Sequence, residues 1–334
     1  MHSLWPSSQF AFALCQPGAE ARLKCEMKRL RPHYNSAMQR PGLVTFKAPS
    51  MEVRPDDDPR AMFARAWGCS AGTAKTPDDV RVIIERLRPT VIFVGPREPG
   101  GIVDVAWREL SGKNEVSGPK PEQLVVDVVV AEGEPALVGW HAHGRSRHIT
   151  PSGLFDYAVP EAAPSRAYGK AVEGMLWSQA DIRPGEVMLE IGAAPGGATL
   201  AYLERGLNVF AVDTQPMAAM ILAHPNCLGW SQKSIGDVAW EDLPTHVQWI
   251  SADAGISPVH MTRALRRLTL HYRSTLRGLL LTLKLNDAAA IAAMPGLLEE
   301  LKRGDATVDA IQLQTNRSDL FVGVRYRSSN RKLR

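Results

Sequence analysis

The sequence predicts two domains, an α+β region over residues 1–150 and a doubly wound α/β domain over residues 151–334. Three observations lead to this prediction. The length of 334 residues suits two cores of about 150 residues each. A stretch rich in Pro, Gly, Ser and charge, from Gly144 to Pro164, is typical of a connector. Beyond it, apolar strands alternate regularly with amphipathic helices, which favours a parallel sheet covered on both faces.

The N-terminal region mixes strands and helices without strict alternation. Thr76, followed by Pro77, Asp78 and Asp79, places an N-cap oxygen, a proline and two acids at the start of a helix. The expected elements are strands at 9–15, 42–46 and 91–94, helices at 21–30, 59–67 and 76–87, and a hairpin of 124–130 with 136–140. No catalytic constellation is visible in this half.

The C-terminal region has the alternating pattern of a doubly wound fold, in which ligands bind at the carboxyl ends of the strands. Helices are expected at 167–178, 196–204, 215–223, 258–274 and 288–302, and strands at 187–191, 208–212, 247–252, 278–284, 307–314 and 320–326.

Composition indicates a soluble, cytoplasmic protein. Hydrophobic residues make up 45% and charged residues 22%, and no apolar run approaches the roughly 20 residues of a membrane span. The four cysteines (Cys15, Cys25, Cys69 and Cys227) form no metal-ligand pattern, so we expect reduced thiols and no metal. The net charge of +4 weakly favours a polyanionic partner such as RNA.

The strongest motif is the glycine loop Glu190-Ile191-Gly192-Ala193-Ala194-Pro195-Gly196-Gly197, between an apolar strand and a helix. Such a loop brings backbone N–H groups close to a ligand. Asp213 follows the next strand, where a carboxylate can accept ribose hydroxyls. This pattern fits any adenosine-containing cofactor, NAD included, and a tight turn without a ligand is the alternative. The absence of a third glycine in dinucleotide register, together with Pro195, favours S-adenosylmethionine.

This loop resembles the cofactor loop of the FtsJ-type ribose 2'-O-methyltransferases, and among these it is most similar to the THUMP-containing large-subunit rRNA cytidine 2'-O-methyltransferases. The resemblance extends over nearly the whole chain and is weaker in the N-terminal half. Its segments are Pro164-Ser165-Arg166 with Lys170, Val212-Asp213 with Pro216-Met217, Trp249 to Asp253, Leu283-Lys284-Leu285, Arg317 to Val322, Cys15 to Gly18 with Glu20, and Phe63-Ala64-Arg65.

The resemblance implies a catalytic Lys-Asp-Lys-Glu tetrad, matched here by Lys170, Asp253, Lys284 and Asp319. Asp319 departs from the family, which has glutamate there, and Asn286 stands where proline is usual. Lys284 is expected to be the general base, with Asp253 as its partner near the methyl group, and Lys170 and Asp319 as orienting groups. A lysine base needs a lowered pKa, which burial and a second ammonium would provide.

The resemblance also implies a set of contacts to S-adenosylmethionine. Asp237 would read the adenine amino group and Ser165 would contribute through the Pro-Ser-Arg turn. The full expected set is Ser165, Gly192, Ala194, Pro195, Gly196, Gly197, Asp213, Asp237 and Asp253.

Basic residues cluster at three places in and around the C-terminal half, where they either contact RNA phosphates or form solvated faces. These are Arg263, Arg266, Arg267 and Arg273 on one helix, Arg145, Arg147, His148 and Arg166 in the connector, and Arg325, Arg327, Arg331, Lys332 and Arg334 in the tail.

We therefore expect methyl transfer to a ribose 2'-hydroxyl of RNA, with a cytidine of large-subunit rRNA implied by the resemblance alone. A non-catalytic RNA-binding or ribosome-assembly factor that retains the cofactor fold is the alternative, motivated by Asp319. A methyltransferase acting on protein or a small molecule is disfavoured, because no Asn-Pro-Pro-Tyr motif is present.

Overall fold

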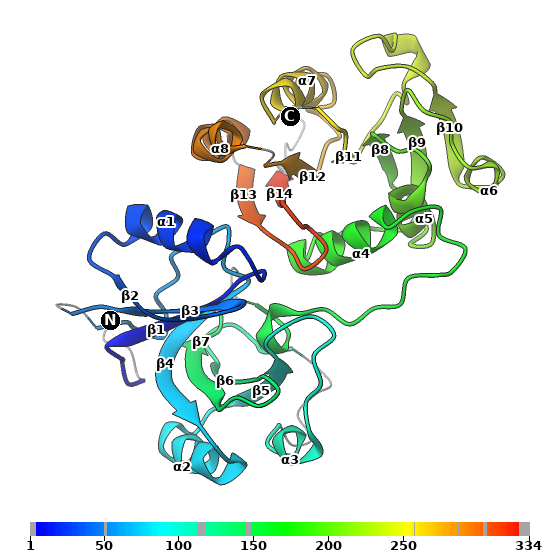
Figure 1. Ribbon diagram of the computed structural model, residues 1–334. Helices are drawn as coiled ribbons and strands as arrows, with labels where there is room; N and C mark the ends of the chain where they lie inside the picture. The colour runs from blue at the N-terminus through cyan, green and yellow to red at the C-terminus, as the bar shows by residue number, and fades with distance from the viewer. Residues whose placement is uncertain are drawn as a thin grey trace, which may run out of the picture. The chain divides into compact units, whose positions relative to one another are not determined.

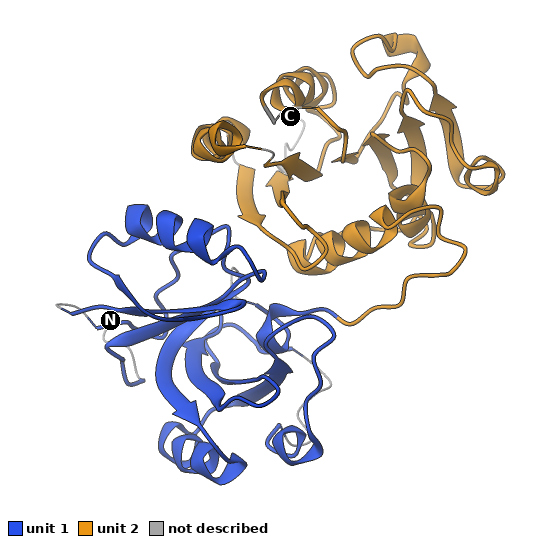
Figure 2. Cartoon of the chain, viewed as in Figure 1, with its two compact units in different colours: residues 1–155 blue, residues 156–334 orange. Residues whose placement is uncertain are grey.

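The computed structural model describes residues 5–49, 52–111, 118–144, 148–256, 258–285, 287–302 and 306–326. It divides into two compact units, residues 1–155 and 156–334 (Figure 2). The division falls inside the predicted connector. Arg145, Arg147, Asn286 and the basic tail from residue 327 lie outside the described residues.

The first unit is built on a seven-stranded mixed sheet with strand order β2-β3-β1-β4-β7-β6-β5. Helix α1 packs against β2 and β3, and α2 packs against β4 (Figure 1). A small apolar cluster of Phe12, Leu14, Leu43, Ala66, Val129 and Leu137 lies on the sheet. The elements are β1 (Phe10–Leu14), α1 (Glu20–Leu30), β2 (Asn35–Arg40), β3 (Leu43–Lys47), β4 (Ala66–Ala74), α2 (Pro77–Leu87), β5 (Val91–Pro96), α3 (Val105–Arg108), β6 (Leu124–Val130), β7 (Ala136–Ala142) and η1 (Pro151–Gly153).

Several local predictions for this unit are confirmed. Helix α2 begins with the expected cap, in which Thr76 and Asp79 hydrogen-bond each other's backbone N–H groups. The predicted hairpin is present, with β6 and β7 paired antiparallel. The expected helix at 59–67 is wrong. Residues 59–65 form turns and irregular backbone, and the chain from Ala66 forms β4, which pairs with both β1 and β7. Strand β2 was not predicted.

The second unit is a doubly wound sheet with strand order β10-β9-β8-β11-β12-β14-β13. All neighbouring strands are parallel except β14, which is antiparallel to β12 and β13. Helices α4 and α5 lie on one face and α7 and α8 on the other (Figure 1). The elements are α4 (Ala167–Ser178), β8 (Val187–Ile191), α5 (Gly197–Leu203), β9 (Asn208–Val212), α6 (Ala219–Leu222), β10 (Cys227–Ser231), η2 (Trp240–Asp242), β11 (Trp249–Ala252), α7 (Pro258–His271), β12 (Gly278–Lys284), α8 (Ala288–Leu301), β13 (Ala306–Ile311) and β14 (Asp319–Tyr326).

The predicted alternation of this unit is confirmed apart from β10, which was missed, and α6, which is shorter than expected. The strand order reverses at β8, whose neighbours β9 and β11 lead to opposite edges of the sheet. In doubly wound sheets the crevice beyond the carboxyl ends at this point holds the ligand. The glycine loop and Asp253 follow the two strands, β8 and β11, that flank it.

Among the described residues, no helix is both long and apolar enough to cross a membrane. The four cysteines are free thiols.

Candidate functional site

Four side chains that are distant in the sequence form one ion-pair network at the carboxyl edge of the second sheet. Lys284 Nζ lies 2.7 Å from Asp253 Oδ1 and 3.1 Å from Asp319 Oδ2. Lys170 Nζ lies 3.2 Å from Asp253 Oδ2 and 3.0 Å from Asp319 Oδ2. Each carboxylate therefore binds both ammonium groups, and the structure brings the whole predicted tetrad together.

The elements of the sheet explain why these residues meet. Asp253 follows β11 directly and Lys284 ends the neighbouring parallel strand β12, so both emerge at the same edge. Asp319 begins β14, where it is the register partner of Lys284 in the antiparallel pair. Lys170 reaches the network from α4, the helix that enters the unit.

The electrostatics of Lys284 differ from the expected ones. Burial lowers the pKa of Lys284, but hydrogen bonds and charges from Asp253 and Asp319 outweigh burial and raise the pKa above its ordinary value. The predicted lowering of this pKa is therefore wrong for this arrangement. Two carboxylates within 3.1 Å stabilise the ammonium more than burial of a side chain that is still 21% exposed destabilises it.

The glycine loop is shaped by close backbone approaches. A Cβ atom at Gly192, whose φ is +78°, would lie 2.8 Å from the backbone of Ala254. At Gly197 it would lie 2.3 Å from Ser165 Oγ, so the predicted Ser165 abuts the start of α5. Ala194 and Pro195 complete the turn, and Gly196 adopts a φ of +114°. At Gly192 and Gly197 only glycine fits without displacing the backbone of Ala254 or Ser165.

Asp213 anchors the glycine loop to the end of β9. Its Oδ2 accepts a hydrogen bond from the Ala194 N–H at 2.9 Å, and its Oδ1 accepts one from the Gln215 N–H at 2.8 Å. Each carboxylate oxygen has two lone pairs, so the group retains acceptor capacity for a pair of hydroxyls.

Asp237 lies in an exposed turn between β10 and η2, where its backbone N–H donates to Ser234 O. Within the described part of the chain, no hydrogen bond or ion pair links it to the other predicted site residues. Its assignment to the adenine amino group stays a prediction.

Two buried glutamates near the site were not assigned from the sequence. Glu190 is 3% exposed, and burial raises its pKa to about 8. Glu173 is fully buried on α4 and accepts hydrogen bonds from Gln314 N, Thr315 N and Thr315 Oγ1 at 2.6–3.0 Å. The sequence feature that could have identified both is a single acid among residues that are otherwise apolar and buried, in α4 for Glu173 and in β8 for Glu190. The contacts of Glu173 hold α4 against the turn that precedes Asp319.

Some of the predicted basic residues are exposed, whereas others contact acidic side chains within the protein. Helix α7 buries Met261, Leu265 and Leu268, and Tyr272 just after the helix is buried too, as predicted. The four predicted arginines, three on α7 and Arg273 just after it, are exposed. Arg267 stacks over the Trp240 ring at 4.4 Å. Two residues predicted to contribute to basic RNA-facing clusters are engaged elsewhere, since Arg325 pairs with Asp309 in β13 and His148 is buried against Asp127.

No protein-family model matches the chain. Ribosomal RNA large subunit methyltransferase M from Alkalilimnicola ehrlichii is 28% identical over 290 residues, which cover 75% of this chain and 76% of that protein. The protein of the same name from Laribacter hongkongensis is 38% identical over 110 residues, 31% of this chain and 30% of the relative. For the relatives from Marinomonas sp. and Halorhodospira halophila, the match spans 40% and 53% of their length. The chain is thus similar to several proteins named as rRNA methyltransferases.

Among solved structures, the chain is similar to Burkholderia thailandensis 1,6-didemethyltoxoflavin-N1-methyltransferase with bound 1,6-didemethyltoxoflavin and S-adenosylhomocysteine. The identity is 20%, the match covers 49% of this chain and 78% of the other, and the TM-score is 0.36. A likeness of this size carries no argument about function.

Proposed function

We propose that this protein is an S-adenosylmethionine-dependent methyltransferase that modifies a ribose 2'-hydroxyl in ribosomal RNA. The observation that carries the proposal is the network of Lys170, Asp253, Lys284 and Asp319 at the carboxyl edge of the sheet. Its member Asp253 follows β11, the strand next to β8, after which the glycine loop begins. The relatives named as large-subunit rRNA methyltransferases support the substrate class. Cytidine as the target, a THUMP role for residues 1–150 in RNA binding, and a cytoplasmic location belong to the same proposal.

The residues around the glycine loop suit S-adenosylmethionine, which supplies an electrophilic methyl group on a sulfonium. Asp213 keeps free lone pairs for ribose hydroxyls. Gly192, Gly196 and Gly197 allow the loop to pack against Ala254, Ile221 and Ser165, which gives it the tight shape of a cofactor loop. Ser165, Ala194, Pro195, Asp237 and Asp253 are the remaining proposed contacts. Glu190 adds a buried oxygen, Oε2, with no hydrogen-bond partner among the described residues.

In the proposed reaction Lys284 takes the proton of the 2'-hydroxyl while Asp253 and Asp319 fix the position of its Nζ. Lys170, bound to the same two carboxylates, holds them in place. Because the pKa of Lys284 is raised, its ammonium must first lose a proton. The rate of methyl transfer should therefore rise with pH, about tenfold per unit, as long as the pH stays below that pKa. A rate independent of pH would instead indicate that the ammonium only orients the hydroxyl.

The experiment is tritium transfer from labelled S-adenosylmethionine to unmodified total rRNA, comparing wild type with Lys284→Ala. We expect label at an alkali-resistant linkage with wild type and a loss of at least about 100-fold with the variant. Lys302→Ala, at an exposed residue directly after α8, is the control. Cofactor binding, measured by calorimetry, should survive in both variants, which separates loss of chemistry from loss of the site.

The raised pKa of Lys284 is the observation that favours the alternative, a non-catalytic RNA-binding or assembly factor with the same fold. Such a factor would bind cofactor and RNA but label no RNA, and Lys284→Ala would keep its biological activity. Label that survives nuclease treatment of the substrate would point instead to a protein or small-molecule acceptor.

A further inference from the structure

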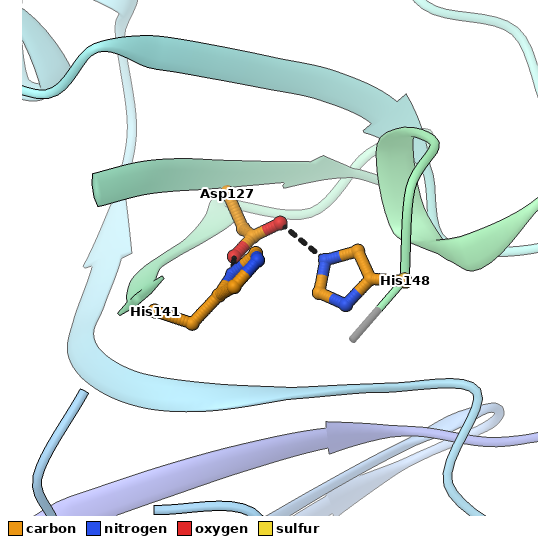
Figure 3. Close-up of side chains that lie close together, drawn as sticks. All are labelled: Asp127, His141 and His148. Atoms are coloured by element: carbon orange, nitrogen blue, oxygen red, sulfur yellow. Dashed lines mark hydrogen bonds and ion pairs between the residues drawn. The ribbon is translucent and has the colours of Figure 1, made fainter. Parts of the chain in front are cut away.

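A second cluster of chemically active side chains lies inside the first unit, in β6, β7 and the segment that follows β7. Asp127, His141 and His148 point toward one another there (Figure 3). In the β6–β7 register Asp127 is opposite Gly139 and His141 is opposite Val125. Asp127 and His141 are therefore diagonal neighbours on one face of the sheet.

The geometry of the three side chains is tight. Asp127 Oδ2 lies 2.8 Å from His141 Nδ1, and Asp127 Oδ1 lies 2.8 Å from His148 Nε2. The two imidazole rings are 4.4 Å apart between centroids. One ligand atom from each residue lies within 4.8 Å of the others, and every side chain is at most 5% exposed.

We propose that Asp127, His141 and His148 bind one divalent transition-metal ion of the zinc class. Two imidazole nitrogens and one carboxylate oxygen are a donor set that Zn²⁺ accepts in tetrahedral sites, with a fourth ligand from water or a neighbour. Zinc bonds of about 2.0–2.1 Å would require the two 2.8 Å contacts to open by roughly 0.5 Å, a small side-chain movement.

The charge of the cluster is compatible with a divalent ion. A divalent ion held by one aspartate and two neutral histidines has a net charge of +1, the same as the cluster with both histidines protonated. One metal ion coordinates all three ligand atoms at once, whereas each proton forms a hydrogen bond between Asp127 and only one of the histidines.

The position of the site assigns it a structural role. His148 lies just before η1, which packs against β5 and β6. A Cβ atom at Gly95 in β5 would lie 2.8 Å from Pro151 and Ser152, so this segment lies closely on the sheet. A metal ion bound by Asp127 of β6, His141 of β7 and His148 would link the segment from His148 to η1 to the sheet of the first unit.

The test uses the untagged full-length protein, stripped of metal and then titrated with Zn²⁺ against a chromophoric chelator. We expect one equivalent bound by wild type and by His33→Gln, an exposed histidine of the same unit. Asp127→Asn and His148→Gln should each weaken binding by at least about tenfold, with circular dichroism confirming that each variant is folded. Equal zinc binding in wild type and a folded variant would overturn the proposal.

A second measurement on wild type alone keeps the proposal testable if both variants unfold. Co²⁺ bound to nitrogen and oxygen in a tetrahedral site gives visible d–d bands without the near-ultraviolet charge transfer of a thiolate. Those bands at one equivalent support the site. Thiolate bands would assign the metal to a cysteine, and a spectrum of aqueous Co²⁺ would leave the triad as a hydrogen-bonded tie, so either result overturns the proposal.

Discussion

Lys284 and Asp319 are register partners on the antiparallel strands β12 and β14, and the lysine ammonium lies 3.1 Å from Asp319 Oδ2. Residues directly opposed in this way have Cβ atoms about 4.5–5.5 Å apart. That proximity explains how Asp319 reaches the ammonium of Lys284, although the family that the sequence resembles has the longer glutamate at this position. The same Oδ2 also lies 3.0 Å from Lys170, so one short side chain serves both lysines.

Asp319 should therefore be needed for its charge more than for its length. We expect Asp319→Asn to lower kcat for methyl transfer by about 100-fold, because the amide cannot neutralise two ammonium groups. Asp319→Glu should stay within about tenfold of wild type. Initial rates of tritium transfer to rRNA would measure both, with Asp242→Asn, an exposed acid, as the control. If Asp319→Asn keeps full activity, the network is structural only.

The resemblance to a known family implied the four members of this network, but the sequence did not predict its electrostatics. Asp253 and Lys284 end neighbouring strands, so the alternating pattern alone places them at one edge of the sheet. The contact between Lys284 and Asp319 depends on the register of β14, which returns antiparallel after β13. The pKa of Lys284 depends on carboxylate distances below about 3.2 Å, which no sequence pattern provides.

The first unit was harder to predict, because its strands depend on partners distant in the sequence. Strand β4 carries Gly68, Ser70, Gly72 and Thr73 and has no apolar alternation, so only its pairing with β1 and β7 defines it. A Cβ atom at Gly68 would lie 2.7 Å from Trp140 O, which shows how closely β7 approaches. The buried Asp127 cluster has the same origin, since nothing in the spacing of one aspartate and two histidines indicates that they meet.

Glu173 should act as a positioning residue for Asp319. It is the acceptor for two backbone N–H groups and one hydroxyl in the turn before β14. Glu173→Gln lowers the acceptor capacity of a fully buried group, so we expect a loss of about 2 kcal/mol in the free energy of unfolding. Urea denaturation would measure it, with Glu300→Gln on the surface as the control.

Glu173→Gln should also show whether Glu173 positions Asp319 for catalysis or only stabilises the fold. At a temperature where Glu173→Gln is fully folded, we expect kcat to fall by about tenfold while KM for S-adenosylmethionine stays within about twofold. A variant that is destabilised but has unchanged kcat would show that the turn finds its place without Glu173.

Glu190 should make the protein less stable as the pH rises. Burial raises its pKa to about 8, so the folded state keeps a proton that the unfolded state loses near pH 4.3. Between these two values the folded state binds more protons, and the free energy of unfolding falls with increasing pH. The difference between the pKa values of Glu190 in the folded and unfolded states sets an upper limit, on the order of 5 kcal/mol, on this loss in the free energy of unfolding.

Replacing Glu190 by Gln removes this titration. We expect the stability of Glu190→Gln to vary less between pH 5.5 and 8.5 than that of wild type, and the variant to be the more stable protein at pH 8.5. Denaturant unfolding at the two pH values would measure both effects, with Glu241→Gln as an exposed control. Parallel pH profiles for Glu190→Gln and wild type would show that Glu190 is already ionised at pH 5.5.

The exposed arginines on α7 and just after it should contribute to RNA binding without contributing to the chemical step. Arg263, Arg266 and Arg273 are exposed, whereas Met261, Leu265 and Leu268 form the buried face of the helix. Replacing the three arginines by Gln should therefore leave the fold intact. Arg267 is left in place because it stacks on Trp240. If these three arginines each bind a phosphate of the RNA, their replacement should reduce the slope of log affinity against log salt concentration by about 2.

Binding of an rRNA fragment at several salt concentrations would measure that slope, and single-turnover methylation at saturating RNA would measure the chemical step. We expect weaker affinity with an unchanged single-turnover rate, because the arginines act on encounter and register and not on the 2'-hydroxyl. Arg205→Gln combined with Lys233→Gln and Lys302→Gln, three exposed basic residues outside α7, gives the same change in net charge and is the control. Equal slopes for the α7 variant and this control would assign the arginines to a solvated face and move the RNA path elsewhere on the protein.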